Sequence, residues 1–148
     1  MEKTWFWKKE TILLVEDDGS VVNYFRCILP EEKYLLYTTD NGEEAIELIE
    51  GIDFDIIILD FHLKGEKNGF DILKACRHKT TAKIYSNTGS PEHSAKMALL
   101  GCDQALHKNS YIIHRALGLE IGEKGDFQKR EGHIEKALED FDKACTKD

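Results

Sequence analysis

The 148-residue chain has the length of one domain with at most a short appendage, and its 41% apolar content and two prolines exclude extensive disorder. A net charge of −8 argues against non-specific binding to nucleic acid or acidic membranes. No stretch approaches the ~18 apolar residues of a membrane span, and the N-terminus lacks a secretory pattern. The four cysteines are scattered, so we expect free thiols in the cytoplasm.

Two short, continuously apolar runs are the strongest strand predictions, Ile12–Val15 and Ile56–Leu59. Continuous runs are typical of parallel strands that helices cover on both faces. Weaker strand predictions fall at 34–38, 83–86 and 103–107. Helical patterns lie between all of these strands, which indicates a doubly wound, five-stranded parallel α/β sheet with right-handed crossovers.

The helix boundaries follow from capping residues. Ser20 is expected to cap a helix that runs to Leu29, and Ser90 precedes a proline that suits a first helical turn. Gly51 is expected to end a helix that starts at Glu43, because glycine can take the left-handed conformation freely. Two more helices are predicted at 70–76 and 112–117.

The chain after Gly118 is predicted to be separate from this sheet. Apolar residues recur at helical spacing over 134–144, which indicates an extra amphipathic C-terminal helix. We therefore expect a main domain at 10–118 and a helical extension at 119–148. The extension is either an appendage or the start of an output region.

Acidic residues directly follow the first and third predicted strands. These are Glu16 and Asp17 after the first strand and Asp60 after the third. In the flavodoxin-like strand order 2-1-3-4-5 these two strands are neighbours, so the three carboxylates would converge at the carboxyl edge of the sheet. Like charges repel, and a hard divalent cation relieves the repulsion. The sequence therefore predicts a Mg²⁺ site here.

Two further strand ends carry groups that suit phosphoryl transfer to a carboxylate. Such transfer needs cations and donors around the equatorial phosphoryl oxygens. Lys108, after the fifth predicted strand, would supply an ammonium group, and Ser86, at the end of the fourth, a hydroxyl. Thr88 is a rival for this hydroxyl role.

Several segments together resemble the receiver domain of bacterial two-component response regulators, of the chemotaxis-receiver type. The segments are 12–18, 40–45, 55–63, 69–73 and 101–108, and the resemblance spans roughly 10–118. It implies that Asp60 is the phosphoacceptor, that Glu16 and Asp17 form the acidic pocket, that Asp17, Asp60 and the backbone carbonyl of His62 hold Mg²⁺, and that Ser86 and Lys108 bind the phosphoryl group. It places Asp18 outside the metal shell, as an acid that starts a helix.

Three positions depart from the family pattern. Asn109 stands where a proline usually follows the lysine, so that loop is expected to turn differently. Ala105 replaces the usual aromatic, which leaves no aromatic rotamer switch, so a signal would pass through backbone or helix shifts. The loop at 64–68 lacks a common proline.

The resemblance implies a phosphoacceptor signalling domain that catalyses only its own Mg²⁺-dependent phosphorylation and dephosphorylation. Expected partners are a sensor histidine kinase or histidine phosphotransfer protein and an unknown downstream protein, with a homodimer as an open option. Direct contact with nucleic acid or membrane is not expected. The alternative is a phosphorylation-independent pseudo-receiver that acts as a scaffold. A haloacid-dehalogenase-type phosphatase fits less well, because His62 stands where that chemistry needs a second acid.

Overall fold

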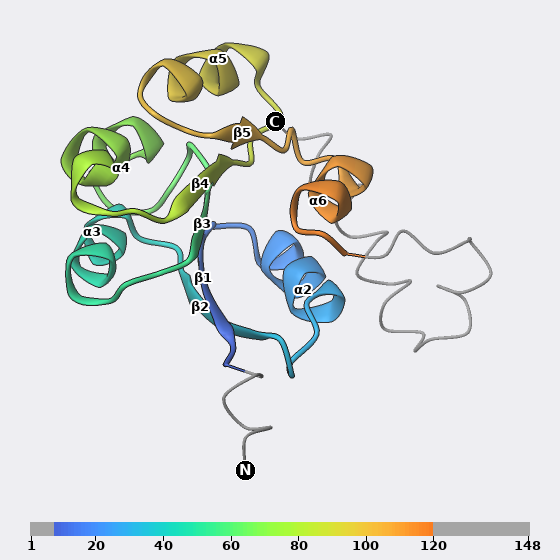
Figure 1. Ribbon diagram of the computed structural model, residues 1–148. Helices are drawn as coiled ribbons and strands as arrows, with labels where there is room; N and C mark the ends of the chain where they lie inside the picture. The colour runs from blue at the N-terminus through green and yellow to red at the C-terminus, as the bar shows by residue number, and fades with distance from the viewer. Residues whose placement is uncertain (1–7, 120–148) are drawn as a thin grey trace.

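The structure, a computed structural model, describes residues 8–119. One sheet contains five parallel strands in the order β2-β1-β3-β4-β5 (Figure 1). The strands are β1 (Glu10–Val15), β2 (Tyr34–Thr39), β3 (Ile56–Leu59), β4 (Lys83–Ser86) and β5 (Gln104–Ala105). The helices are α2 (Gly19–Ile28), α3 (Gly42–Gly51), α4 (Gly69–Cys76), α5 (Pro91–Leu99) and α6 (Ser110–Ala116), with a 3-10 turn η1 (Arg77–Lys79). The predicted flavodoxin-like fold and strand order are confirmed, and the helix predicted at 134–144 lies outside the described residues.

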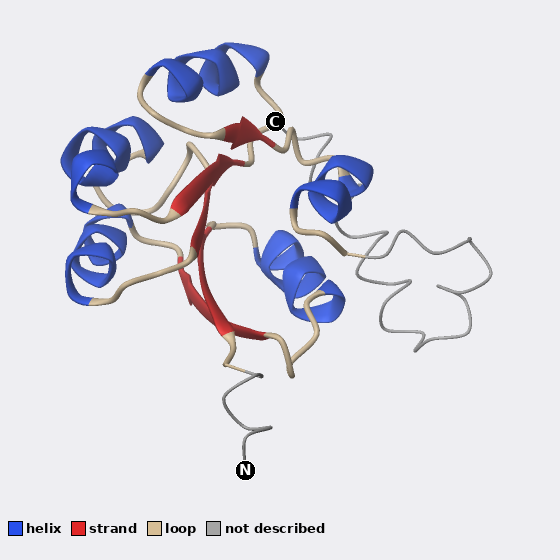
Figure 2. Cartoon of the chain, in the orientation of Figure 1, coloured by secondary structure: helices blue, strands red, loops and turns tan. Residues whose placement is uncertain are grey.

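The sheet is a middle layer with helices on both sides. Helices α2 and α6 cover one face, and α3, α4 and α5 cover the other (Figure 2). Ile12 and Leu14 pack with α2 and α6, whereas Leu13 and Val15 pack with the opposite helices, and all four are fully buried. Because both faces of β1 are dry, every residue of the run must be apolar, which explains why the run does not alternate.

Two predicted helix caps were wrong, although α3 does end at Gly51 as predicted. Asp18, and not Ser20, caps α2, since the Asp18 side chain accepts a hydrogen bond from the Ser20 backbone N–H at 2.8 Å. Gly51 does not end α3 in a left-handed conformation. It is the last helical residue, and the extended Ile52 caps the helix. The predicted cap at Ser90 is confirmed, because its side chain accepts from the backbone N–H of His93.

The fifth strand is shorter than the predicted span of 103–107. Only Gln104–Ala105 is a strand, although Leu106 still donates its backbone N–H to Ser86 O at 2.7 Å. The chain then turns through two consecutive residues with positive φ, His107 (56°) and Lys108 (51°). The left-handed region is incompatible with an extended strand, so the pairing with β4 ends there.

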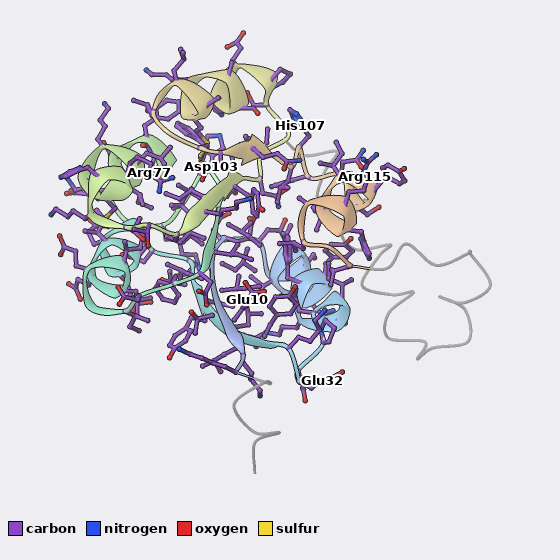
Figure 3. All side chains as sticks on the ribbon, in the orientation of Figure 1. Glu10, Glu32, Arg77, Asp103, His107 and Arg115 are labelled. Atoms are coloured by element: carbon purple, nitrogen blue, oxygen red, sulfur yellow. The ribbon has the colours of Figure 1, made fainter. Side chains whose placement is uncertain are left out.

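Arg77 joins the end of α4 to the β5 edge. Its guanidinium donates hydrogen bonds to Asp103 Oδ2 (3.2 Å) and to the backbone carbonyls of Gly101 (3.0 Å), Thr80 (3.2 Å) and Ala82 (2.9 Å). Asp103 Oδ2 also accepts the backbone N–H of Ile84, in β4. Figure 3 shows Arg77 and Asp103 between α4 and β5, so one side chain connects the end of α4 to the segments that precede β4 and β5. This contact helps to fix the edge of the sheet that carries the following loop.

The cysteines and the hydropathy of the helices also bear on the predictions from composition. Cys27, Cys76 and Cys102 are free thiols, as predicted, and Cys145 lies outside the described part. Burial and the nearby Asp103 raise the pKa of Cys102 to about 12, which keeps this thiol protonated at neutral pH. Within residues 8–119, no helix is long and apolar enough to cross a membrane.

Candidate phosphoryl-acceptor site

The carboxyl ends of β1, β3 and β4 lie level at one edge of the sheet. Val15 pairs with Leu59, and Leu59 with Ser86. The ladder continues one residue beyond the strands, because the backbone N–H of Asp60 donates to Val15 O (3.0 Å) and that of Asn87 to Leu59 O (2.9 Å). Main-chain hydrogen bonds therefore hold the residues that follow these strands.

Three carboxylates gather at this edge, as the sequence predicts. Glu16, Asp17 and Asp60 each offer an oxygen, and these oxygens all lie within 4.8 Å of one another. Glu16 and Asp60 are buried, at 2% and 3% exposure, whereas Asp17 is exposed. Carboxylates with open access to water on one side suit Mg²⁺, which keeps several water ligands.

Asp18 stays outside this group and organises its surroundings. Its side chain caps α2, and its backbone N–H donates to Glu16 Oε2 at 3.2 Å. The expectation that Asp18 starts a helix agrees with this position. Beside the acids, an open hollow of about 420 Å³ is lined by residues such as Asp17, Asn23, Arg26 and Thr38. The exposed side of the carboxylate cluster therefore faces a space that solvent and ligands can enter.

Lys108 brings a buried positive charge to the two buried carboxylates. Its Nζ lies 3.8 Å from Asp60 Oδ2 and 4.0 Å from Glu16 Oε2, and its side chain is 3% exposed. Burial raises the pKa of Glu16 to about 10, the neighbouring Asp60 adds to this rise, and Lys108 opposes it. Without a metal ion, Glu16 therefore retains a proton at neutral pH. A divalent cation bound beside Glu16 would supply the positive charge in place of that proton.

The loop that presents Lys108 turns as a pair of left-handed residues. His107 lies between β5 and α6 (Figure 3), and both it and Lys108 have positive φ. A non-glycine residue in this region costs about 1–2 kcal/mol. No peptide bond within residues 8–119 is cis. Asn109 then caps α6 by accepting from the backbone N–H of Ile112 at 3.0 Å.

The structure favours Ser86 over Thr88 as the hydroxyl near the acceptor. Ser86 Oγ is buried and has no hydrogen-bond partner within residues 8–119. Thr88 is also buried, but its Oγ1 accepts the backbone N–H of Ser90 at 3.2 Å, just before α5. An unpaired buried hydroxyl is costly unless a ligand completes it, so Ser86 is the freer donor.

His62 lies in the loop between β3 and α4, and that loop is anchored. The backbone N–H of Lys64 donates to Asp40 O (2.8 Å), and that of Gly42 donates to Lys64 O (3.3 Å). An ion pair joins Lys64 Nζ to Asp40 Oδ2 at 3.1 Å. Although the loop has no proline at 64–68, main-chain hydrogen bonds fix it to the turn before α3. The His62 side chain is exposed.

Sequence reasoning missed two features of this site. Asn87 is fully buried, and its Oδ1 accepts the backbone N–H of Lys108 at 2.9 Å. The Phe61 ring stacks on His93 of α5, with centroids 3.7 Å apart and planes at 23°. The sole sequence signal for Asn87 is a polar residue directly after a strand. No sequence spacing shows that Phe61 and His93 meet, since they lie in different elements.

Comparison with known proteins agrees with this geometry. The family model of the response regulator receiver domain matches residues 12–113. The cell cycle response regulator CtrA of Brucella ovis is 34% identical over 100 residues, which cover 66% of this chain and 43% of that protein. The chain thus spans less than half the length of the curated relatives it matches.

Solved structures give the same result for the fold. The chemotaxis protein CheY4 of Vibrio cholerae is 26% identical, with a TM-score of 0.64, and the match covers 75% of this chain and 98% of that chain. The response regulator TrrA of Thermotoga maritima, solved in complex with Mg²⁺-BeF, is 25% identical, with a TM-score of 0.64. That match covers 75% of this chain and 99% of that one.

Proposed function

Because the chain belongs to the response regulator receiver domain family, we propose that Asp60 accepts a phosphoryl group and that this modification switches protein–protein contacts in signal transduction. One observation carries the proposal. The buried Asp60 carboxylate lies 3.8 Å from the Lys108 ammonium group, inside a cluster of three carboxylates. Two buried acids against one lysine cannot both ionise cheaply, so either one of them keeps a proton or a cation must bind beside them.

In the proposed reaction, an Asp60 carboxylate oxygen attacks the phosphorus atom of a phosphohistidine. The new O–P bond forms as the P–N bond breaks, and the electron pair stays on the donor imidazole, which then takes a proton. Lys108 and the Ser86 hydroxyl bind equatorial phosphoryl oxygens, since the Lys108 ammonium group already faces the Asp60 carboxylate and Ser86 Oγ has no hydrogen-bond partner among the described residues.

The residues proposed to hold Mg²⁺ are Asp17 and Asp60, with the backbone carbonyl of His62, and Glu16 beside them completes the acidic pocket. When bound, Mg²⁺ would reduce the repulsion between the carboxylates and an incoming phosphoryl group. The carboxylates, for their part, are pre-positioned by the ladder bonds at the ends of β1 and β3, so little reorganisation is needed on binding.

The switch is proposed to act through the main chain, because Ala105 offers no aromatic rotamer. Ala105 is paired with Ser86 in the β4–β5 ladder, and the next residue donates its N–H to Ser86 O. A shift of Ser86 toward a phosphoryl oxygen would therefore displace β5 and the loop before α6. This coupling supports a change on the surface formed by those elements.

The proposed phosphoryl donors are a sensor histidine kinase or a histidine phosphotransfer protein, and the recipient of the signal is a downstream protein. Self-association into a homodimer and a cytoplasmic location stay predictions. Since the chain matches 43% of the length of CtrA, the output of that longer protein is not carried over to this chain.

The test is incubation with acetyl phosphate and Mg²⁺, followed by intact-mass spectrometry. The expected result is a mass increase of one phosphoryl group in the wild type and no increase in Asp60→Asn. Asp53→Asn, at an exposed acid before the same strand, is the matched control and should be modified normally. A wild-type protein that stays unmodified with every donor would overturn the proposal in favour of the phosphorylation-independent pseudo-receiver.

A further inference from the structure

We propose that Asn87 is a positioning residue that holds the Lys108 backbone so that its ammonium group reaches Asp60. Asn87 Oδ1 accepts the Lys108 backbone N–H at 2.9 Å, and the Lys108 Nζ lies 3.8 Å from Asp60 Oδ2. One amide thus fixes the base of the side chain whose tip faces the acceptor. The kinetic consequence of this inference rests on the proposed function, whereas its structural consequence does not.

The conformation of the lysine loop requires such a contact. His107 and Lys108 both have left-handed backbones, and neither is a glycine. Strained residues persist only where the surroundings fix them from several sides. Here Leu106 N–H binds Ser86 O before the turn, and Asn109 N–H binds Leu106 O across it. The bond from Asn87 lies between these two and fixes Lys108 itself.

Simple packing does not account for an asparagine at this position. Asn87 is fully buried, and its Nδ2 has no hydrogen-bond partner among the described residues. A buried amide with an unpaired donor destabilises the fold relative to an apolar side chain of similar volume. An asparagine at this position therefore needs a reason, which its carbonyl oxygen can supply. The bond from Oδ1 to Lys108 provides that reason.

The metal ligands should not depend on Asn87. Asp17 and Asp60 follow β1 and β3, and ladder bonds to Thr39 O and Val15 O hold Glu16 and Asp60 in place. Asn87 instead connects β4 to the loop after β5. Loss of its side chain should therefore weaken binding of a phosphoryl group without weakening binding of Mg²⁺.

The experiment compares Asn87→Ala with the wild type and with Ile28→Val, a core truncation at the last residue of α2 that provides a stability control. Two constants are measured, the affinity for Mg²⁺ alone and the affinity for beryllofluoride in the presence of Mg²⁺. We expect Asn87→Ala to lower beryllofluoride affinity and the phosphorylation rate by about 10- to 100-fold, as small misplacements of a reactive group do. The Mg²⁺ affinity of Asn87→Ala should stay within about twofold of the wild-type value. Ile28→Val should change neither the Mg²⁺ affinity nor the beryllofluoride affinity.

A double substitution separates positioning from general damage. If Asn87 acts through Lys108, Asn87→Ala combined with Lys108→Ala should bind beryllofluoride as weakly as Lys108→Ala alone. Additive losses, or an equal loss of Mg²⁺ affinity in Asn87→Ala, would overturn the inference.

Amide hydrogen exchange at Lys108 provides a readout that needs no phosphorylation. Its amide should be protected in the wild type and exchange at least about tenfold faster in Asn87→Ala, because its acceptor is gone. Unchanged protection overturns the inference. If the wild type takes no phosphoryl group but Lys108 loses protection in Asn87→Ala, the proposed function fails and the positioning role stands.

Discussion

Lys108 Nζ lies 3.8 Å from Asp60 Oδ2, and each side chain is 3% exposed. The two residues follow different strands, Asp60 after the central strand β3 and Lys108 after the edge strand β5, with β4 between them. Their contact therefore depends on the strand order and on the left-handed turn at Lys108 together. Glu16 Oε2 lies 4.0 Å from the same ammonium group, so one lysine faces two buried carboxyl groups.

Removal of this ammonium group should destabilise the metal-free protein. Lys108→Met keeps the aliphatic length but leaves the buried Asp60 without its cation, and breaking a buried pair in this way costs about 3 kcal/mol. We expect urea unfolding to show a loss of this size and added Mg²⁺ to recover a large part of it. Lys33→Met, at an exposed lysine, should change stability by less than about 0.5 kcal/mol. Equal losses in both variants would contradict the assigned role.

Stability without metal should fall as the pH rises. The pKa of Glu16 is raised from 4.5 to about 10, so the folded protein binds a proton that the unfolded chain releases. The stabilising contribution of this proton is complete below pH 4.5 and is lost progressively toward pH 10, with a slope of at most about 1.4 kcal/mol per pH unit. Urea titrations with a chelator across this range would measure the slope.

Glu16→Gln provides the control for this pH dependence. A glutamine cannot release the proton, so the slope should become shallower, and the added stability from Mg²⁺ should no longer grow with pH. An identical slope in Glu16→Gln and the wild type would assign the effect to another group.

The sequence predicts the strand ends of this site correctly. Glu16 and Asp60 each follow an apolar run that is buried on both faces, so the end of the run marks the edge of the core. The local sequence pattern is therefore enough to predict a carboxylate at that edge. The strand order then brings the acids together, and short parallel crossovers leave few other orders.

The missed features all depend on partners that are distant in the chain. Asn87 binds a main-chain group 21 residues away, and Arg77 binds Asp103 across 26 residues. Local pattern carries no information about such pairs. The wrong cap at Ser20 has a different cause, because Asp18 is an equally good capping residue two positions earlier and its side chain reaches the first turn.

Arg77 should be a larger contributor to stability than a surface cation on the same segment. Arg77→Ala removes four hydrogen bonds, three of them to backbone carbonyls, and we expect a loss of about 2–3 kcal/mol. Lys79→Ala, which breaks an exposed ion pair with Glu50, should cost much less, because water screens that pair. Chemical denaturation measures both. Arg77→Lys should recover only part of the loss, since an ammonium group lacks the planar fork, and full recovery would show that charge alone matters.

The loop after Asp60 should tolerate no side chain at Gly65. This glycine has φ of +85°, and a Cβ there would collide with the Glu43 carboxylate and lie 2.8 Å from Asn41 Nδ2. Gly65→Ala should therefore destabilise the protein by about 1–3 kcal/mol and loosen the loop that carries the proposed His62 ligand. Gly51→Ala is the matched control, because nothing lies within 4 Å of its added Cβ and the residue is helical, so it should stabilise by about 0.5–1 kcal/mol. Thermal unfolding gives both signs, and Mg²⁺ titration should show weaker binding in Gly65→Ala alone. If Gly65→Ala is as stable as Gly51→Ala and binds Mg²⁺ normally, the conformation of this loop does not position the proposed His62 ligand.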